Sequence, residues 1–306
     1  MTASDRVHGR SGQRKDAERR RYVVLVTGAS SGIGRACALR LDERGLWVYA
    51  GVRSEAAAAA LVREASSRLT AVLLDVTNER AIATTVAQIA ASLGDGDAFA
   101  LVNNAGTVLS GPLEFTSNAA LGRQLEVNVI APVAVTRACL PLLRRHSGRI
   151  VNVGSTSGRI SSAFLGPYCA SKFALEALTE ALRLELAAFG IHVCMVEPGV
   201  VATPLWKKTL QAEERALAEL PEEGKAWYGE ALRRRGRLLR RLATTGMSPE
   251  KIAEAVHRAL SAKRPRRRYV VGWGARIRTS LVRWLPDRWR DALTVLRAAG
   301  ASAWSR

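Results

Sequence analysis

The stretch Tyr22-Val-Val-Leu-Val-Thr27, followed at once by Gly28-Ala-Ser-Ser-Gly32-Ile-Gly34, decides the fold of this chain. Its first part is a short apolar run typical of a fully buried parallel strand, and its glycine-rich part opens a helical pattern. Such a turn lets backbone come close to a pyrophosphate, which the N–H groups and positive dipole end of the following helix stabilise. Glycine is needed because a Cβ would collide with the ligand or with the helix–strand packing. The expected phosphate-binding residues are Gly28, Ser30, Ser31, Gly32, Ile33 and Gly34.

The chain continues this alternation of strands and helices. Apolar runs predict strands at Tyr22–Thr27, Trp47–Val52, Thr70–Leu74, Ala98–Val102, Arg149–Gly154, Ile191–Val196 and Arg268–Val271. Helical patterns lie between them at Gly34–Arg44, Glu79–Leu93, Gly122–Arg145 and Tyr168–Phe189. Crossovers of this length predict an α/β fold with a Rossmann-type, doubly wound parallel sheet. We expect one domain over 22–274, with a helical substrate insert at about 204–247.

The net charge of +19 is spread unevenly along the 306 residues. Residues 1–21 hold 7 Lys or Arg against 3 Asp or Glu, residues 22–203 hold 15 against 14, and residues 204–306 hold 24 against 10. A protein built around nucleic acid more often carries the charge on its main fold, so nucleic acid is not an expected partner. Residues 1–21 are predicted to be a disordered basic tail, because they lack apolar periodicity.

Residues 275–306 are predicted to be a basic amphipathic tail, with a helix at Asp287–Ala299. Such a helix fits a peripheral contact with an anionic membrane, or a cover for an apolar patch on its own subunit or on a partner in a homo-oligomer. Neither this tail nor the insert has an apolar run long enough to span a membrane. The four cysteines form no CxxC pair and the four histidines no cluster. We therefore expect reduced thiols, no metal site and a cytoplasmic enzyme.

The GxxxGxG spacing, together with Thr27 and Ile33, resembles the short-chain dehydrogenase/reductase family in its ordinary single-domain branch. The resemblance continues in order along the chain, with Asp75 after the third strand, Asn103-Asn104-Ala105-Gly106 after the fourth and Pro198-Gly199 after the sixth. It implies a nicotinamide dinucleotide whose adenine amino group bonds Asp75 and whose adenosine ribose lies beside Asn104. The residues that the resemblance adds to the cofactor site are Asp75, Val76, Asn104, Ala105, Gly106, Pro198, Gly199, Val201 and Thr203, the last few framing the nicotinamide.

The end of the second strand bears on the choice between NAD(H) and NADP(H). An acid that bonds the ribose 2′-hydroxyl of NAD is expected there, but Val52 takes this position and Arg53 follows it. Without a carboxylate nothing repels a 2′-phosphate, and an arginine can form charge-assisted bonds to one. The sequence therefore favours NADP(H). NAD(H) is the alternative, because Ser31 takes the place of the second basic residue that NADP-preferring relatives often have in the glycine loop.

Tyr168-Cys-Ala-Ser-Lys172 places a phenol and an ammonium one turn apart on the same helical face. A neighbouring ammonium favours the phenolate and should bring its pKa towards the working range of a proton donor and acceptor. Ser155 follows the fifth strand, where a hydroxyl can hydrogen-bond the substrate oxygen that becomes alkoxide-like. By the resemblance, Lys172 also binds the nicotinamide ribose and Asn128 holds a water that relays protons to Lys172. Asn128 could instead cap or kink its helix.

These residues predict hydride transfer between a nicotinamide and an alcohol–carbonyl pair. The Pro-Gly-Val-Val-Ala-Thr-Pro-Leu-Trp stretch at 198–206 and the tryptophan-bearing tail resemble relatives that act on steroids and retinoids. The leucines of the insert either roof a lipophilic substrate or pack the insert on the core, with its arginines facing water. The alternatives from other classes are a non-catalytic NADP(H) sensor, which uses its basic segments for nucleic acid or membrane attachment, and a peripheral membrane scaffold.

Overall fold

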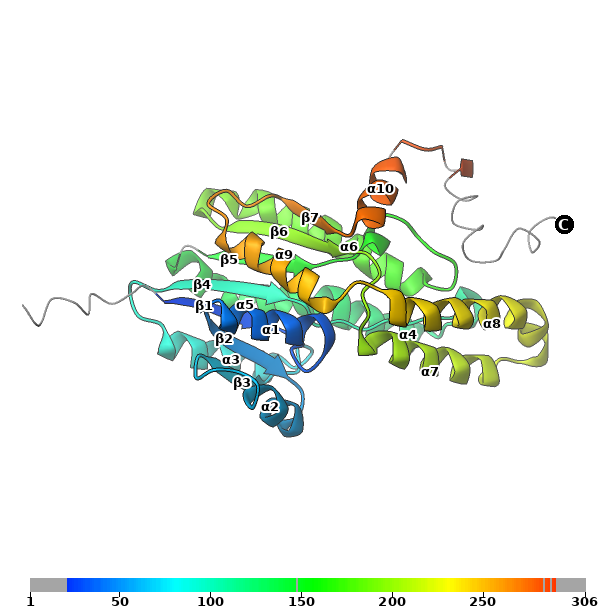
Figure 1. Cartoon of the computed structure of the whole chain (residues 1–306), viewed down its shortest axis with the longest axis horizontal. Helices are drawn as coiled ribbons and strands as arrows, with labels where there is room; N and C mark the ends of the chain where they lie inside the picture. Colours follow the sequence, from blue (N-terminus) through cyan, green and yellow to red (C-terminus); the bar gives the residue numbers. More distant parts are fainter. Residues whose placement is uncertain (1–20, 147, 283, 287, 290–306) are drawn as a thin grey trace, which may run out of the picture.

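A computed structural model describes residues 21–146, 148–282, 284–286 and 288–289. It contains one parallel sheet of seven strands in the order β3-β2-β1-β4-β5-β6-β7 (Figure 1). The strands are β1 (Tyr22–Val26), β2 (Trp47–Val52), β3 (Leu69–Leu73), β4 (Ala98–Asn103), β5 (Arg149–Val153), β6 (His192–Pro198) and β7 (Arg268–Val271). All seven predicted strands are present within one or two residues at each end, and the Rossmann-type doubly wound sheet is confirmed.

Helices cover both faces of the sheet. They are α1 (Gly32–Glu43), α2 (Glu55–Val62), α3 (Glu79–Ser92), α4 (Asn118–Leu125), α5 (Ala131–Arg145), α6 (Gly166–Glu185) and α9 (Pro249–Ser261). Alternate residues of the central strands enter two cores, as the period of two in a strand requires. Val24 and Ala100 pack with α1 and α9 on one face, whereas Leu25 and Phe99 pack with α3 and α5 on the other. The two cores fix the strand register, and with it the positions of the loops at the strand ends.

The predicted helix Gly122–Arg145 is not a continuous α-helix. A π-helical turn at Glu126–Ile130 separates α4 from α5, and it places Asn128 towards the interior. The stretch Asn118–Arg145 is long and apolar enough to cross a membrane by length and composition, and 28% of its most apolar part is buried. Val135, Cys139 and Leu143 of this stretch pack on the sheet, so core packing accounts for part of its apolar character.

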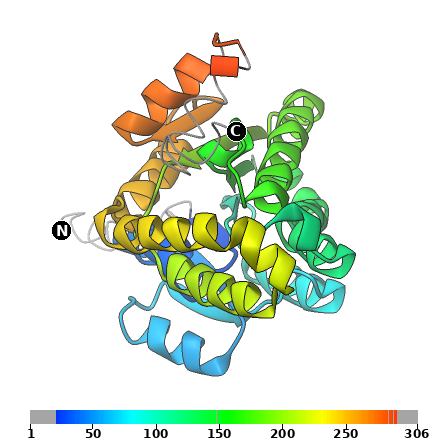
Figure 2. The same cartoon turned by 90° about the vertical axis from the view of Figure 1, so that its right-hand side faces the viewer.

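The insert forms a helical hairpin of α7 (Pro204–Glu219) and α8 (Glu222–Thr245). The hairpin lies beyond the carboxyl ends of the strands and crosses that end of the molecule (Figures 1 and 2). Strand β7 is followed by α10 (Trp273–Val282), which lies apart from the hairpin (Figure 2). The helix predicted at Asp287–Ala299 and the basic tail predicted at 1–21 fall almost entirely outside the described residues.

Candidate active site

The glycine turn after β1 packs closely against the start of α1. A Cβ on Gly34 would lie 2.2 Å from the carbonyl oxygen of Gly28, so the turn and the start of α1 can pack only around glycine. Gly28 has a φ of 68°, in the left-handed region that favours glycine. Ser31 precedes α1 without a capping hydrogen bond from its side chain, which leaves the first N–H groups of the helix for an anion. Uncapped N–H groups at the start of α1, next to a tight glycine turn, fit the pyrophosphate of a dinucleotide.

The loop after β4 is fixed against this turn by Thr27. The Thr27 hydroxyl oxygen accepts hydrogen bonds of 3.0 Å from the backbone N–H groups of Asn104 and Ala105. The Asn104 amide nitrogen donates to the carbonyl oxygens of Thr27 at 2.9 Å and Gly28 at 3.2 Å. Gly106 follows, and a Cβ there would lie 3.4 Å from the side-chain oxygen of Asn128. The structure thus brings the glycine turn and the motif after β4 together.

Arg53 and Asp75 lie at the carboxyl ends of the neighbouring strands β2 and β3. Asp75 accepts hydrogen bonds from the backbone N–H of Thr77 at 3.0 Å and from its hydroxyl at 2.8 Å. These bonds lower the pKa of Asp75 against a smaller opposing effect of burial, and the Arg53 charge lowers it further. Arg53 is exposed, whereas Val52, which precedes Arg53, and Val76, which follows Asp75, are both buried. An exposed cation and an ionised acid are therefore both available at this edge of the glycine turn.

The segment after β6 approaches the glycine turn from the other side. Pro198 ends β6, and the Gly199 N–H donates to the carbonyl oxygen of Val271 at 3.1 Å. Val201 is buried and bridges to Met247 at the end of the insert. Thr203 precedes α7, and its side chain would lie 3.3 Å from a Cβ on Gly32. The loops after β1, β4 and β6 therefore meet at one end of the sheet, the position of the ligand crevice in open parallel sheets.

Tyr168 and Lys172 lie in the first turns of α6, beside the end of β5. The Tyr168 phenol is hydrogen-bonded to the Ser155 side chain, which also accepts the backbone N–H of Ser157 at 3.1 Å. The Lys172 ammonium nitrogen donates to the carbonyl oxygen of Val153 at 3.0 Å and lies 5.9 Å from the centre of the Tyr168 ring. The structure brings three of the four predicted catalytic side chains together at the end of β5.

The pKa values of this pair differ from the sequence expectation. Burial raises the pKa of Tyr168 to about 12, and the hydrogen bond from Ser155 only partly opposes it. Burial also lowers the pKa of Lys172 to about 8. The expected lowering of the phenol pKa by Lys172 is therefore wrong for this structure, because removal from water outweighs the neighbouring charge. Tyr168 is neutral near pH 7 and can donate a proton.

Asn128 is held by the loop that follows Gly106. Its side-chain oxygen accepts the Thr107 N–H at 2.9 Å, and its side-chain nitrogen donates to the Thr107 carbonyl and to the Ser171 hydroxyl, both at 3.0 Å. Gln124, one turn earlier, accepts the Leu109 N–H at 2.6 Å and donates to the Thr107 carbonyl. Asn128 is thus a buried link between the loop and α6 within a π-helical turn, rather than a cap. The roles of Gln124 and Ser171 were not predicted from the sequence. The signal that could have found them is a polar residue at a position where the rest of the helix face is apolar.

Comparison with known proteins agrees with this geometry. The short chain dehydrogenase family profile matches residues 22–214. Retinol dehydrogenase 5 of Mus musculus is 40% identical over 276 residues, which cover 88% of this chain and 86% of the relative. The 17-beta-hydroxysteroid dehydrogenase type 6 of Bos taurus is 37% identical over 279 residues, with the same coverage. A variant of actinorhodin polyketide ketoreductase, solved with NADPH, is 31% identical with a TM-score of 0.67, covering 83% of this chain and 97% of its own.

This chain belongs to the short-chain dehydrogenase/reductase family. Its relatives are dehydrogenases of the steroid and retinol type, as the sequence resemblance implied. It is therefore an oxidoreductase of a family that uses a nicotinamide cofactor.

The helical hairpin of this dehydrogenase is attached by a buried ion pair that the sequence analysis did not predict. Arg235 of α8 donates from Nε to Glu213 of α7 at 2.8 Å and from Nη1 to the carbonyl oxygen of Ala163 at 2.7 Å. Glu213 also accepts the hydroxyl of Ser110, whose oxygen lies 3.0 Å from the carbonyl oxygen of Phe164. The expectation that the arginines of the insert face water is wrong for Arg235, which is 6% exposed. The pair connects the hairpin to the loops after β4 and β5 that flank the crevice.

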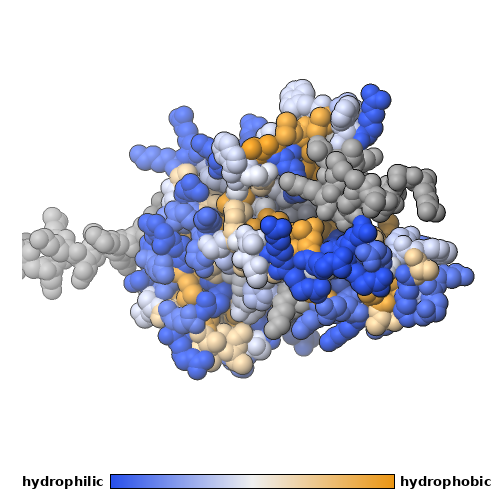
Figure 3. Space-filling model, turned by 45° about the vertical axis from the view of Figure 1, so that its right-hand side comes forward, coloured by the Kyte–Doolittle hydropathy of each residue, from blue (hydrophilic) through white to orange (hydrophobic). Residues whose placement is uncertain are grey.

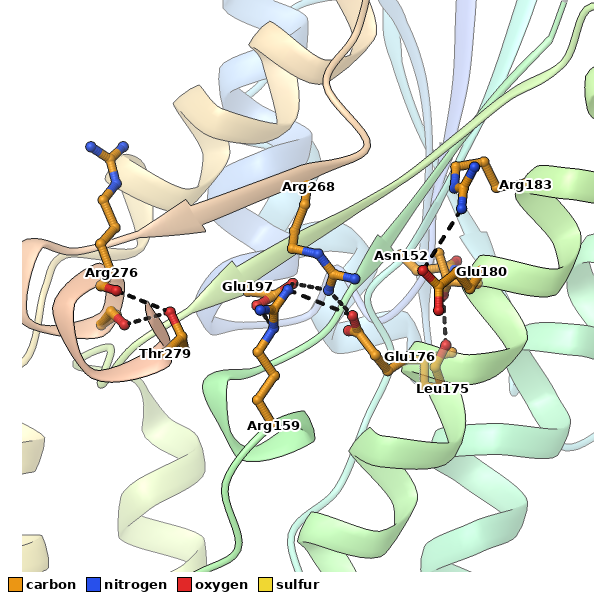
Figure 4. Close-up of polar contacts among 12 residues, drawn as sticks. Asn152, Arg159, Leu175, Glu176, Glu180, Arg183, Glu197, Arg268, Arg276 and Thr279 are labelled. Atoms are coloured by element: carbon orange, nitrogen blue, oxygen red, sulfur yellow. Dashed lines mark hydrogen bonds and ion pairs between the residues drawn. The ribbon is translucent and has the colours of Figure 1, made fainter. Parts of the chain in front are cut away.

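A second cluster of ion pairs lies at the edge of the sheet, beside β6 and β7 (Figure 4). Glu197 of β6 is fully buried and pairs with Arg159 at 2.8 Å and with Arg268 of β7. Arg268 also pairs with Glu176 of α6. Burial raises the pKa of Glu197, and the Arg159 charge opposes this rise. The cluster joins α6, β6 and β7 to the turn after Ser155, but none of its members is a predicted site residue.

Proposed function

We propose that this enzyme interconverts an alcohol and a ketone or aldehyde on a lipophilic substrate, with NADP(H) as its preferred cofactor. The observation that carries the proposal is the group at the end of β5, where Ser155 is bonded to Tyr168 and Lys172 lies one helical turn away. A phenol and a hydroxyl that both reach one point can hydrogen-bond a single substrate oxygen. That geometry serves a carbonyl whose carbon accepts a hydride.

The cofactor site consists of the glycine turn and the loops after β2, β3, β4 and β6. Backbone N–H groups at the start of α1 would hold the pyrophosphate, and Arg53 would bind a 2′-phosphate. Asp75 and Asn104 would hold the adenosine end, with Pro198, Gly199, Val201 and Thr203 at the nicotinamide end. The bound nicotinamide supplies or accepts the hydride at C4. Arg53 supports NADP(H). NAD(H) is the alternative, because the glycine loop has Ser31 instead of a second basic residue that could bind the 2′-phosphate.

Each catalytic side chain has a separate task. Tyr168 donates its phenolic proton to the substrate oxygen during reduction, and its high pKa keeps that proton available at neutral pH. Ser155 donates a hydrogen bond to the same oxygen, where negative charge develops. Lys172 positions the cofactor ribose and stabilises the phenolate by its charge when protonated. Asn128 fixes the loop after β4 and the start of α6, and would hold the water that restores protons through Lys172.

A lipophilic substrate is supported by the relatives and by the hairpin. The relatives are named for retinol and for a hydroxysteroid, which are both apolar alcohols. The hairpin buries Leu232 and Leu239 and lies across the crevice end of the sheet (Figure 2). Self-association is supported by exposed apolar side chains on the π-helical turn before α5 and on α6, including Ile130 and Leu184. A cytoplasmic location and a peripheral membrane contact of residues 275–306 stay predictions.

A panel of substrates tests the proposal directly. Purified enzyme is mixed with all-trans-retinal, a 17-ketosteroid and a small water-soluble ketone, and oxidation of NADPH or NADH is followed at 340 nm. We expect turnover of an apolar carbonyl with NADPH. Tight cofactor binding without turnover of any carbonyl or alcohol would favour the non-catalytic sensor instead.

A further inference from the structure

The short 3₁₀ turn Thr156–Gly158, which we call the serine turn, sets the direction of the Ser155 hydroxyl. The Ser155 hydroxyl oxygen accepts the backbone N–H of Ser157 at 3.1 Å, and the Ser155 carbonyl oxygen accepts the N–H of Gly158 at 2.9 Å. The same hydroxyl is hydrogen-bonded to the Tyr168 phenol. A change in the shape of the serine turn would therefore move the Ser157 N–H and redirect the hydroxyl that meets Tyr168.

Arg278 of α10 reaches this turn from a distant part of the sequence. Its Nη2 donates to the Thr156 hydroxyl oxygen at 2.6 Å. Thr156 is 3% exposed, and Arg278 is partly buried. Burial raises the pKa of the Cys169 thiol, and the charge of Arg278 is one of the effects that oppose this rise. The guanidinium group of Arg278 therefore lies near the residues that directly follow Ser155 and Tyr168.

A groove partly separates α10 from the serine turn. Its volume is about 610 Å³, and it is lined by Gly158 and Arg159 at the turn and by Thr279 and Val282 of α10. The hydrogen bond of Arg278 therefore connects two elements that are not closely packed along this groove. A guanidinium group that donates to a hydroxyl forms a charge-assisted bond, which is stronger than a bond between neutral groups.

The other sides of the serine turn are fixed by different elements. Arg159, directly after the turn, pairs with the fully buried Glu197 of β6 (Figure 4). A Cβ on Gly158 would lie 2.8 Å from the carbonyl oxygen of Lys172, so the turn also lies directly against α6. The turn is thus surrounded by α6, by the edge of the sheet and by α10, and Arg278 is a contact through which α10 takes part.

We propose that Arg278 is a positioning residue of the reaction: by holding Thr156, it keeps the Ser157 N–H on Ser155 and directs the Ser155 hydroxyl to the substrate oxygen. This role rests on the proposed function, in which Ser155 stabilises the charge that develops on that oxygen. A misdirected hydroxyl leaves cofactor binding intact and slows hydride transfer, because misplacement by about 1 Å can cost about a hundredfold in rate. The helix after the last strand thus contributes to the chemical step.

The first test needs no substrate. Hydrogen exchange of the full-length enzyme is followed by mass spectrometry in peptides that cover residues 155–161. In Arg278→Gln and in Thr156→Val, we expect the amides of the serine turn to exchange about fivefold faster or more, because the bond that holds the turn is lost. Thr156→Ser keeps the hydroxyl and should change exchange less than about twofold. Unchanged exchange in both Arg278→Gln and Thr156→Val would overturn the proposal.

The matched control is Arg276→Gln, on the same helix. Arg276 is exposed, and its Nε donates to the carbonyl oxygen of Val270 at 3.0 Å. This variant therefore removes the same charge and one hydrogen bond of α10, but away from the serine turn. The face in Figure 3 is mostly hydrophilic, and glutamine at an exposed arginine keeps the surface polar. We expect exchange of the serine turn in Arg276→Gln to change less than about twofold.

The second test is kinetic and separates positioning from a structural effect. We expect Arg278→Gln to lower kcat about tenfold at saturating NADPH and substrate, and to change the Kd for NADPH less than about twofold. In a Ser155→Ala background, Arg278→Gln should lower kcat by less than about twofold, since the group through which Arg278 acts is gone. Arg278→Lys keeps a charged donor and should recover part of the lost rate.

The outcomes distinguish this proposal from its alternatives. Equal losses of kcat with and without Ser155 would overturn it, because Arg278 would then act through another group or through the whole fold. A loss that Arg276→Gln shares would also overturn it, since loosening of α10 would explain both. If Arg278→Gln does not fold, Thr156→Val decides both tests by the same criteria. Normal turnover of Ser155→Ala would refute the proposed function, and faster exchange of the serine turn in Arg278→Gln would still support the positioning of Ser155.

Discussion

The crevice and the helical hairpin each contain a buried cation, but the two cations have different surroundings. Lys172 in the crevice is 7% exposed and bonds only a backbone carbonyl, with no carboxylate in contact among the described residues. Arg235 in the hairpin is 6% exposed and pairs with Glu213. Burial lowers the pKa of both groups, but Glu213 opposes the shift of Arg235. A buried lysine without a counter-charge can change protonation during a reaction, whereas a paired arginine stays charged and holds structure.

The largest expected effect is on the chemistry of the crevice. Tyr168→Phe removes the proton donor but keeps the ring, so turnover should fall by about a thousandfold or more while cofactor affinity changes little. Turnover is measured with saturating NADPH and the best carbonyl of the panel, and cofactor affinity by fluorescence titration. Phe173→Leu, on an exposed position of the same helix, is the control. A Tyr168→Phe enzyme with a tenth of the normal rate would show that the proton comes from another group.

The next effect concerns the hairpin. Arg235→Met leaves Glu213 buried without its partner, so the free energy of unfolding should fall by about 3–5 kcal/mol. Arg233→Met changes an exposed arginine of the same helix, and its effect should stay below about 0.5 kcal/mol. Urea unfolding at pH 7 measures both.

The double variant Arg235→Met/Glu213→Leu sharpens this result. It removes both charges, and it should recover part of the stability that Arg235→Met loses. If Arg235→Met unfolds at the same urea concentration as the wild type, the pair does not attach the hairpin in solution.

A smaller effect follows from the pKa of Lys172. Its pKa in the folded protein is about 8, below the ordinary value of 10.5, so between these values the unfolded chain binds more protons. Stability from this group therefore rises with pH above 8 and is lost as pH falls through 8. The difference in unfolding free energy between wild type and Lys172→Met should shift in favour of the wild type by about 2 kcal/mol from pH 7 to 9.5. Lys251→Met, at an exposed site, should show a flat difference. A flat difference for Lys172→Met as well would mean that water reaches the ammonium.

The strands and the glycine turn were predictable because they depend on short-range pattern. Apolar runs of five or six residues and the obligatory glycines specify β1, its turn and the order of the loops. Helix α2 was missed because Glu55–Val62 contains five consecutive alanines, which show no apolar periodicity. The buried pair of Arg235 depends on contacts with Ala163 and Glu213, far away in sequence. A signal was nevertheless present, since Arg235 lies between the buried leucines Leu232 and Leu239 at helical spacing.

In the site too, residues of short-range motifs were predictable and residues that depend on distant contacts were not. The motif residues lie together at the strand ends because parallel strands bring their carboxyl ends to one edge of the sheet. The buried amides that hold the helices in place were not predicted. Asn103 donates to Asn152 at 2.9 Å and to Thr136 of α5 at 3.0 Å, and Asn152 donates to Thr179 of α6 at 2.8 Å. Asn103 and Asn152 each lie in an otherwise apolar strand. This pattern marks the two positions as unusual, but it does not identify the helix that supplies the hydrogen-bond partner.

The smallest effect concerns Arg53, which is exposed and makes few contacts of its own. An exposed cation at the end of β2 has no structural task comparable to that of Arg235, so its removal should leave the unfolding free energy within about 0.5 kcal/mol of the wild type. A charge-assisted bond to a 2′-phosphate should instead appear in cofactor binding. Arg53→Ala should raise the KM for NADPH about tenfold and the KM for NADH less than twofold. Arg63→Ala, an exposed arginine just after α2, is the control and should change neither constant. Equal increases for both cofactors, or a wild-type preference for NADH, would assign Arg53 to the surface and leave the 2′-position of the cofactor to other residues.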